Sequence, residues 1–261
     1  MPYMFGGHTD AGYKRDINED HIAVETLGKN QVLALIADGA GSKASTLQPA
    51  QIATDLVSKA IRRISGEQPD MLSANATLCL CEAMRSANAV IGAFKTANEE
   101  FYAGFAASMT CVLLNQDSAG NHVMSFAHIG NTRLYLIRVG GDGTPLIRQL
   151  TKDQTQARSL LDSGEITEEE YHTHPERLVI TGALGLVTDP PIQAFTCQLQ
   201  ENDMLLMTTD GIHYAIRPQS MMDLTLASST LEEACETLSK AAVIQKYCDN
   251  CSSIIIRCSN K

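Results

Sequence analysis

Short apolar runs and longer stretches with helical spacing divide the chain into strands and helices. The runs that predict β-strands are residues 22–28, 31–37, 108–115, 122–129, 132–139, 145–151, 192–199, 203–209 and 252–258. Apolar residues three and four positions apart predict α-helices over residues 48–64, 70–98 and 231–247. Because the two kinds of element are segregated rather than alternating, we expect an α+β fold, a β-sandwich of two antiparallel sheets with helices outside.

Residues 153–185 form a polar interruption between predicted strands. They carry an acidic cluster and two histidines: Glu165, Glu168, Glu169, Glu170, His172 and His174. This composition predicts a short helix and an exposed excursion, which is a common way for a chain to cover a binding site. We expect residues 1–261 to form a single domain from which this flap-like segment projects.

Acidic residues stand at the ends of several predicted strands. Asp38 follows VLALIA and Asp210 follows MLLMTT, whereas Asp249 lies just before SSIIIR and Glu19-Asp20 just before HIAVET. In an antiparallel pair the end of one strand lies beside the start of the next. The sequence therefore predicts that these carboxylates meet at one end of the sheets.

A cluster of carboxylates is unfavourable without cations, because neighbouring negative charges raise one another's pKa. Oxygen ligands without a Cys or His set are typical of Mg²⁺ and Mn²⁺. Gly39 after Asp38 would allow the backbone carbonyl to approach an ion without a side chain in the way. A single Asp-Gly pair is more often a turn or a helix cap, so the metal hypothesis depends on the acids taken together.

Composition and charge narrow the class of protein. The chain has 261 residues, of which 44% are hydrophobic, and a net charge of −10. Without a basic stripe it is not expected to bind nucleic acid. There is no apolar run of about 18 residues and no basic region followed by an apolar stretch at the start, so we expect a cytoplasmic protein without a membrane partner.

The eight cysteines raise the question of a zinc or redox site. Cys248 and Cys251 have C-x-x-C spacing, but Cys79 and Cys81 are too close together to supply the second ligand pair of a structural zinc site. We therefore expect reduced, mostly buried thiols.

Five short motifs carry a resemblance to a known family. They are R-D-I-N-E-D (15–20), A-D-G-A-G-S (37–42), A-H-I-G-N-T-R-L-Y (127–135), T-D-G-I (209–212) and D-N-C-S (249–252). In their order and approximate spacing the chain resembles the metal-dependent PP2C-type (PPM) serine/threonine phosphatases, in the bacterial single-domain form. The resemblance implies a four-layer αββα sandwich with two Mn²⁺ or Mg²⁺ ions at one end.

Metal ligands follow from the resemblance by position. Asp38 would bridge the two ions, and Asp210 and Asp249 would complete the protein ligands of the first. The carbonyl of Gly39 would serve the second ion. Two such ions lower the pKa of a shared water and offset charge on the phosphoryl oxygens.

Three further residues would act on water and phosphate. The resemblance implies that Glu19 and Asp20 hold waters bound to the metals and that Arg15 binds the substrate phosphate. A guanidinium matches phosphate with two hydrogen bonds. The alternative for Arg15 is a surface ion pair with Asp16, and His21 and His128 are interpreted as structural histidines.

The sequence also departs from the family. Asn131 stands where the family has an aspartate that helps to hold a third ion in bacterial relatives, so a third ion is expected to bind weakly or not at all. Ala40 replaces a histidine or methionine, and Gln154 replaces a histidine. The acidic flap-like segment is expected to favour basic phosphopeptides.

The resemblance implies an active phosphatase, a monomer whose partner is a phosphorylated protein substrate. Two alternatives remain open at this stage. The fold could serve as a regulatory or binding module with weak or no activity, which Asn131 and Ala40 favour, or the enzyme could act on small phosphate esters.

Overall fold

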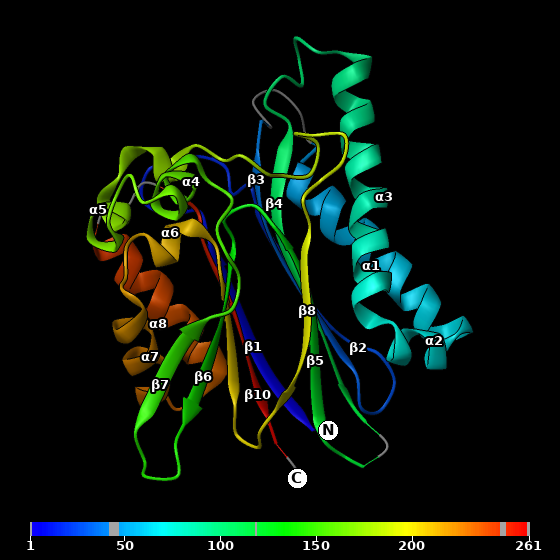
Figure 1. Ribbon diagram of the computed structural model, residues 1–261, viewed down its shortest axis with the longest axis vertical. Helices are drawn as coiled ribbons and strands as arrows, with labels where there is room; N and C mark the ends of the chain where they lie inside the picture. The colour runs from blue at the N-terminus through cyan, green and yellow to red at the C-terminus, as the bar shows by residue number, and fades with distance from the viewer. Residues whose placement is uncertain (1, 42–46, 118, 246–248, 260–261) are drawn as a thin grey trace.

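Two five-stranded antiparallel sheets form the centre of the computed structural model, which describes residues 2–41, 47–117, 119–245 and 249–259. The first sheet has the order β1-β10-β9-β6-β7 and the second β2-β3-β4-β5-β8 (Figure 1). Their strands are β1 (Tyr3–Asp10), β2 (Asp20–Thr26), β3 (Val32–Ala40), β4 (Ala106–Gln116), β5 (His122–Ile129), β6 (Arg133–Val139), β7 (Pro145–Gln149), β8 (Gln193–Leu199), β9 (Met204–Thr208) and β10 (Cys251–Cys258).

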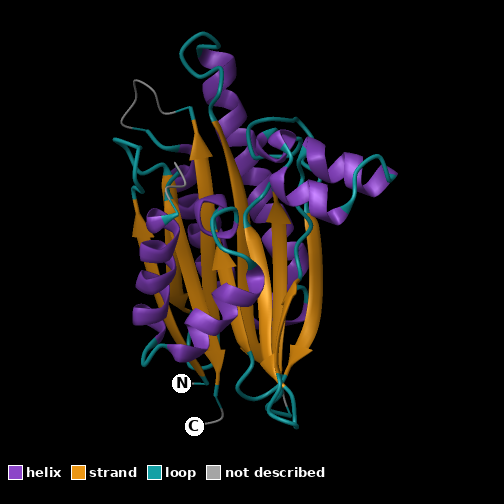
Figure 2. Ribbon diagram, turned by 90° about the vertical axis from the view of Figure 1, so that its left-hand side faces the viewer, coloured by secondary structure: helices purple, strands orange, loops and turns teal. Residues whose placement is uncertain are grey.

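Helices cover the outer face of each sheet, so the molecule has four layers; Figure 1 shows them side by side, and Figure 2 shows one helical layer in front of the strands. Over the second sheet lie α1 (Pro49–Glu67) and α3 (Ala76–Ala97); over the first lie α7 (Pro218–Ala227) and α8 (Leu231–Ile244). Separate apolar clusters fill the space between the two sheets and beneath each helical layer. This arrangement confirms the predicted α+β sandwich.

Three elements differ from the sequence prediction. The helix expected over 70–98 is divided into α2 (Pro69–Ala74) and α3, because Asn75 has a non-helical backbone (φ −130, ψ 37). Strand β1 was not predicted because Gly6-Gly7 interrupts its apolar pattern; a Cβ at Gly6 would lie 2.5 Å from the backbone nitrogen of Glu232 in α8. Helix α7 was also missed, and the end of the helix predicted over 231–247 lies partly outside the described residues.

Between β7 and β8 the chain leaves the sheets and forms three short helices. They are α4 (Gln156–Ser163), α5 (Glu168–Thr173) and the 3-10 helix η1 (Pro175–Leu178). We call residues 156–178 the flap. Thr167 and Glu170 form a capping box that fixes the start of α5. The predicted short helix and excursion therefore correspond to three helical pieces.

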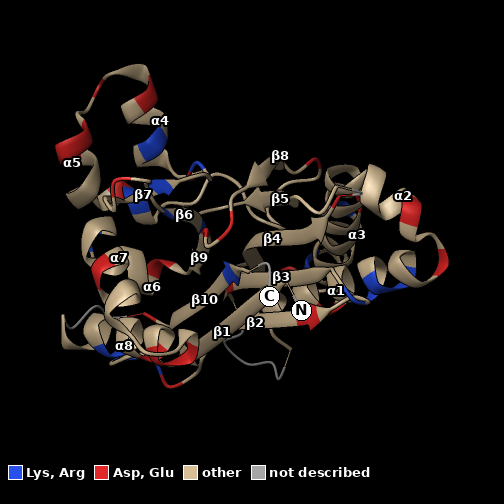
Figure 3. Ribbon diagram, turned by 90° about the horizontal axis from the view of Figure 1, so that it is seen from below, with Lys and Arg blue, Asp and Glu red and all other residues tan. Residues whose placement is uncertain are grey.

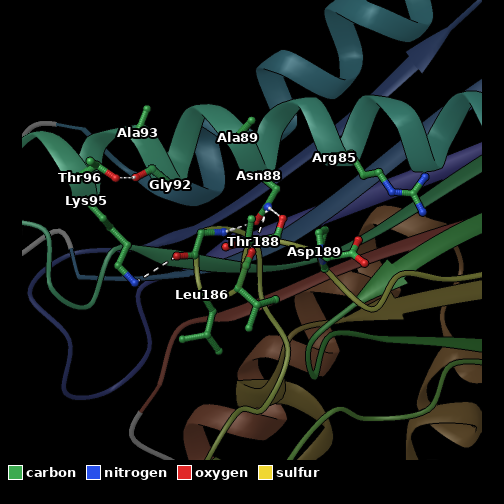
Figure 4. Close-up of a pocket in the computed structure, with 13 residues that line it drawn as sticks. Arg85, Asn88, Ala89, Gly92, Ala93, Lys95, Thr96, Leu186, Thr188 and Asp189 are labelled. Carbon is green, nitrogen blue, oxygen red and sulfur yellow. Dashed lines mark hydrogen bonds between the residues drawn. The ribbon is translucent and has the colours of Figure 1, made fainter.

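The segment that leads from the flap to β8 is fixed on α3 by Asn88 (Figure 4). The side-chain oxygen of Asn88 accepts a hydrogen bond from the Gly185 nitrogen at 2.7 Å, and its amide donates to the carbonyl of Val187 at 3.0 Å. Gly185 has φ +82, and a Cβ there would lie 2.3 Å from a side-chain carbon of Ile91. This segment therefore requires glycine where it meets α3.

The described cysteines are free thiols, as predicted. Most of them are buried, and Cys81 and Cys197 are half-buried. Cys248, the first residue of the C-x-x-C pair, lies outside the described residues. In the described part of the chain, none of the helices combines the length and apolar character that a membrane span requires.

Candidate functional site

Strand register brings the predicted site acids to one end of the sandwich. Asp20 at the start of β2 pairs directly with Asp38 near the end of β3. In the other sheet, Asp210 begins α6 (Asp210–His213) just after β9, and Asp249 precedes β10, the neighbour of β9. The two chain termini lie at the opposite end of the sheets (Figure 1). The four carboxylates thus gather at one end, as the antiparallel pairing predicted.

Asp20 is buried, and one of its two carboxylate oxygens accepts two hydrogen bonds. Its Oδ2 accepts from the hydroxyls of Thr209 at 2.8 Å and Ser252 at 2.7 Å. The pKa of Asp20 is raised to about 7, mainly by burial and also by the charge of Asp249, against the lowering effect of the two hydroxyls. The position of this carboxylate is therefore fixed by both sheets.

Asp210 and Asp38 show the electrostatic cost of the cluster. The pKa of Asp210 is raised to about 8, mainly by burial and also by the charges of Asp249 and Asp20. The pKa of Asp38 is raised well above its ordinary range, first by burial and then by the charge of Asp210. Without a cation, full ionisation of this group is unfavourable at neutral pH.

Gly39 has no room for a side chain. A Cβ at this position would lie 2.8 Å from the carbonyl oxygen of Glu19 and 3.2 Å from the Cβ of Ala50. Its own nitrogen donates a hydrogen bond to that same carbonyl at 3.2 Å. The glycine therefore ties the loop before β2 to the end of β3.

Arg15 contacts the acid cluster rather than Asp16. Its Nη2 donates to Asp249 Oδ2 at 2.8 Å, and the Arg15 side chain is 47% exposed. The hydrogen bond with Asp249 raises the pKa of the guanidinium. The alternative of a surface pair with Asp16 is thus replaced by a contact with a predicted metal ligand.

Asn250 was not predicted as a site residue, although it organises the loop that carries Arg15. Its side-chain amide donates to the carbonyls of Ala11 at 2.9 Å and Ile17 at 3.1 Å, and its side-chain oxygen accepts from the Glu19 nitrogen at 2.9 Å. The side chain is 4% exposed. Its place beside Asp249 in the D-N-C-S motif is the sequence signal that could have identified it.

Asn131 is buried and uses both ends of its amide. Its Nδ2 donates to Asp210 Oδ2 at 3.3 Å, and its Oδ1 accepts from the Ser108 hydroxyl at 2.9 Å. The residue thus presents a hydrogen-bond donor to the acid cluster, and its oxygen is engaged elsewhere. Within the described residues, no group of three or more Asp, Glu, His or Cys side chains is arranged to hold a metal ion.

A buried ion pair connects the flap to the core. Arg133 binds Asp153 through Nε at 2.9 Å and Nη2 at 2.6 Å, and the Tyr171 hydroxyl of α5 donates to Asp153 Oδ2 at 2.6 Å. Arg133 and Asp153 are 3% and 2% exposed. Arg133 lies in the A-H-I-G-N-T-R-L-Y motif, but neither residue was predicted to have a role.

The two histidines interpreted as structural lie against threonines. Nδ1 of His21 is 2.7 Å from the Thr54 hydroxyl, and Nδ1 of His128 is 2.9 Å from the Thr110 hydroxyl. Burial lowers the pKa of His128 to about 4, so its imidazole is neutral at physiological pH. Gln154 donates to the Pro191 carbonyl at 2.6 Å and bridges two loops.

Comparison with known proteins gives consistent matches. A family model described as protein phosphatase 2C matches residues 10–247. The chain is 30% identical over 233 residues to the serine/threonine protein phosphatase PstP of Mycobacterium tuberculosis. That match covers 88% of this chain and 40% of PstP, so the chain spans less than half the length of this relative.

Solved structures extend the similarity to the whole fold. A single-substitution variant of a bacterial serine phosphatase has a TM-score of 0.85 and 25% identity, with 100% of this chain and 99% of that chain covered. The catalytic domain of PstP in complex with two manganese ions has a TM-score of 0.75 and 25% identity over 99% of both chains. With the sandwich, the ordered motifs and the acid cluster at one end, these matches show that the chain belongs to the protein phosphatase 2C family of serine/threonine protein phosphatases.

Proposed function

We propose that this chain hydrolyses phosphoserine and phosphothreonine in proteins at a centre of two Mn²⁺ or Mg²⁺ ions. The observation that carries the proposal is the meeting of Asp20, Asp38 and Asp210 at one end of the sandwich, with raised pKa values. Family membership supports the reaction class, and the relative solved with two manganese ions supports the metal. The chain would act as a monomeric, single-domain enzyme with the flap beside its site.

The donor set fits hard divalent cations. Asp38, Asp210 and Asp249 would supply carboxylate oxygens and Gly39 a backbone carbonyl, and no sulfur or imidazole is required. Asp249 and Asp210 each give an oxygen to a nitrogen donor, Arg15 and Asn131 respectively. Those oxygens would turn from their partners when cations bind, which accounts for why no three acids among the described residues are arranged to hold an ion.

Arg15 would bind the phosphate of the substrate. Its guanidinium is half-exposed at the edge of the cluster, and its carboxylate partner among the described residues is Asp249. If Asp249 turns to a cation, the two parallel N–H groups of Arg15 become available to phosphoryl oxygens. The Asn250 side chain keeps this loop in place during the exchange.

Glu19 and Asp20 would hold the waters that surround the ions. The carboxylate of Asp20 is fixed by the Thr209 and Ser252 hydroxyls, so its free oxygen has a defined direction. When bound, two divalent ions supply a water of lowered pKa and offset charge on the phosphoryl oxygens. The chain then needs no Ser, Cys or His nucleophile.

The test is a phosphothreonine-peptide and aryl-phosphate assay titrated with Mn²⁺, combined with calorimetry of Mn²⁺ binding. We expect Asp38→Asn and Asp210→Asn to lose at least about a hundredfold in kcat/KM. Asp16→Asn is the matched control, because Asp16 is an exposed acid in the Arg15 loop. Unchanged turnover in Asp38→Asn would refute the proposal.

The regulatory-module alternative is favoured by Asn131, whose oxygen is engaged with Ser108. It predicts a folded wild type with no Mn²⁺ binding below about millimolar concentration and no turnover. Comparison of rates on phosphopeptides and on small phosphate esters separates the second alternative, an esterase for metabolites, from the protein phosphatase.

A further inference from the structure

A cavity of about 520 Å³ lies between the flap and the helices that follow Asp210. Its walls come from β6, from α5 and η1 on one side and from α6 and the start of α7 on the other. The lining residues used below are Arg133, Arg177, His213, Tyr214 and Arg217. Because α6 begins at Asp210 and has four residues, the cavity lies about 6 Å along the helix from the acid cluster.

The cavity wall is cationic in an acidic protein. The chain has a net charge of −10, yet among the described residues that line the cavity there are three arginines and no Asp or Glu. Asp153, which does not line the cavity, forms an ion pair with Arg133 and balances its charge. Two guanidinium groups, those of Arg177 and Arg217, therefore remain without a carboxylate partner in the described structure.

Arg177 is held in place by neutral groups. Its guanidinium lies 4.7 Å from the ring centroid of Tyr214, and it donates to the carbonyl of His172. The Tyr214 hydroxyl in turn donates to the Arg177 carbonyl at 2.9 Å. A cation stacked on an aromatic ring is oriented and still able to bind an anion.

His213 adds an unsatisfied polar atom to the same wall. The imidazole is 6% exposed, and its Nδ1 lies 2.9 Å from the Thr208 hydroxyl. Its Nε2 is buried and has no hydrogen-bond partner in the described structure. Buried polar atoms are rarely left unpaired, and in the tautomer whose Nδ1 accepts from the Thr208 hydroxyl, Nε2 carries a proton that it can donate to an anion.

We propose that this cavity is an accessory anion subsite that takes a carboxylate or a second phosphate carried by the substrate protein. The proposal depends on the proposed phosphatase function and specifies its substrate class. The acidic first turn of α5, with Glu168, Glu169 and Glu170, is at the outer end of the flap (Figure 3). The flap thus carries negative charge in α5 at its outer end and the positive charge of Arg177 beside the cavity. An acidic residue of the substrate would therefore bind at the cavity and not at α5.

The test uses phosphothreonine peptides in which a single Glu replaces Gln at successive positions on either side of the phosphothreonine. In the wild type, Glu at one or two of these positions is expected to raise kcat/KM about five- to tenfold. Arg177→Gln/Arg217→Gln is expected to abolish this preference while aryl-phosphate turnover stays within about twofold of wild type. Arg63→Gln, which removes an exposed arginine of α1, is the matched control and is expected to keep the preference.

Since Arg177 also packs on Tyr214, Arg217→Gln is measured alone as well. It removes an exposed guanidinium and leaves the contact between Arg177 and Tyr214 in place, and it must lower the preference on its own. Equal rates on Glu and Gln peptides in the wild type, or an unchanged preference in the double variant, would overturn the subsite. A thermal shift with inorganic sulfate that needs both arginines, without any Glu preference, would assign the cavity to a free anion and likewise overturn it.

Failure of the proposed function is distinguishable from failure of the subsite. If the wild type hydrolyses neither peptide nor aryl phosphate, binding of the unphosphorylated Glu peptides is measured by fluorescence anisotropy. Tighter binding of Glu than Gln peptides by the wild type, lost in the double variant, supports the subsite without catalysis. Equal binding of both peptides overturns it.

Discussion

The Arg133–Asp153 ion pair gives the most direct test of how the core holds the flap. Both side chains are buried, and the carboxylate also accepts the Tyr171 hydroxyl. Replacing Asp153 with Asn keeps the shape but leaves a guanidinium that is 3% exposed without its counter-charge. Breaking one side of a buried pair costs about 3–5 kcal/mol, so we expect Asp153→Asn to lower the free energy of unfolding by that amount.

The pKa of Asp153 supports the magnitude. Burial raises this pKa, but the charge and hydrogen bonds of Arg133 outweigh burial and lower it from 3.8 to about 2. That difference corresponds to about 2–3 kcal/mol in favour of the ionised form. Because the folded pKa lies below the unfolded value, the stabilisation is present at neutral pH and is lost as the pH falls from about 4 to about 2.

Urea unfolding followed by circular dichroism measures the effect, since the chain has no Trp for fluorescence. The matched control is Asp203→Asn, which breaks the Arg138–Asp203 pair; Arg138 is 34% exposed and can be solvated afterwards. We expect about 1 kcal/mol for the control. The double variant Arg133→Met/Asp153→Leu is expected to be more stable than Asp153→Asn, because it leaves no unpaired charge in the protein interior.

The reasoning fails if Asp153→Asn costs no more than the control. It also fails if the cost is the same at neutral pH and below pH 3, about the midpoint of the two pKa values, because the ionised carboxylate would then have no part in it. A retained m-value is required in both cases, so that the change reports the free energy of unfolding rather than a loss of cooperativity.

Three further predictions concern other parts of the molecule. Asn88→Ala removes the hydrogen bonds that fix the segment before β8 and is expected to lower the free energy of unfolding by about 2–3 kcal/mol. A loss below about 0.5 kcal/mol in urea unfolding would contradict this. The pKa of Asp210 is raised from 3.8 to about 8 in the folded, metal-free protein, so the unfolded state ionises first and the free energy of unfolding falls as the pH rises from about 4 to about 8. Asp210→Asn removes this loss and is expected to be more stable than wild type at pH 8 and less stable once Mn²⁺ is added, as measured by thermal unfolding. Gly12→Ala places a Cβ 2.0 Å from the Asp249 carbonyl oxygen and is expected to lower kcat/KM about tenfold or more. Gly28 has a similar φ but lies in open space, so Gly28→Ala is the control and is expected to leave kcat/KM unchanged.

The sequence predicts the architecture and the meeting of the acids because both depend on short-range patterns. Apolar runs that end on a carboxylate define strand ends, and antiparallel pairing then places Asp20 opposite Asp38. Strand β1 and the break at Asn75 were missed, because a glycine pair and a single non-helical residue leave little trace in periodicity. Local pattern is therefore informative about which residues lie at an end of a sheet.

The sequence does not predict which partner a buried polar side chain selects. Asn250 joins two carbonyls and an amide more than two hundred residues away in the chain, and Tyr171 reaches Asp153 across the base of the flap. These contacts depend on the tertiary positions of whole elements, which no local pattern contains. The same reason hides the arginine-lined cavity, because Arg177 and Arg217 come from separate helical segments.

Asn131 illustrates how structure changes the interpretation of a departure from the family. As a residue type it is a missing acid and suggests a loss of function. In the structure its amide donates to Asp210, and this hydrogen bond lowers the pKa that burial and neighbouring acids raise. An aspartate at the same buried position would instead add a further negative charge to the group. The asparagine therefore lowers the electrostatic cost of the carboxylate cluster while no cation is bound, and it holds Asp210 in place until the proposed ions take over that oxygen.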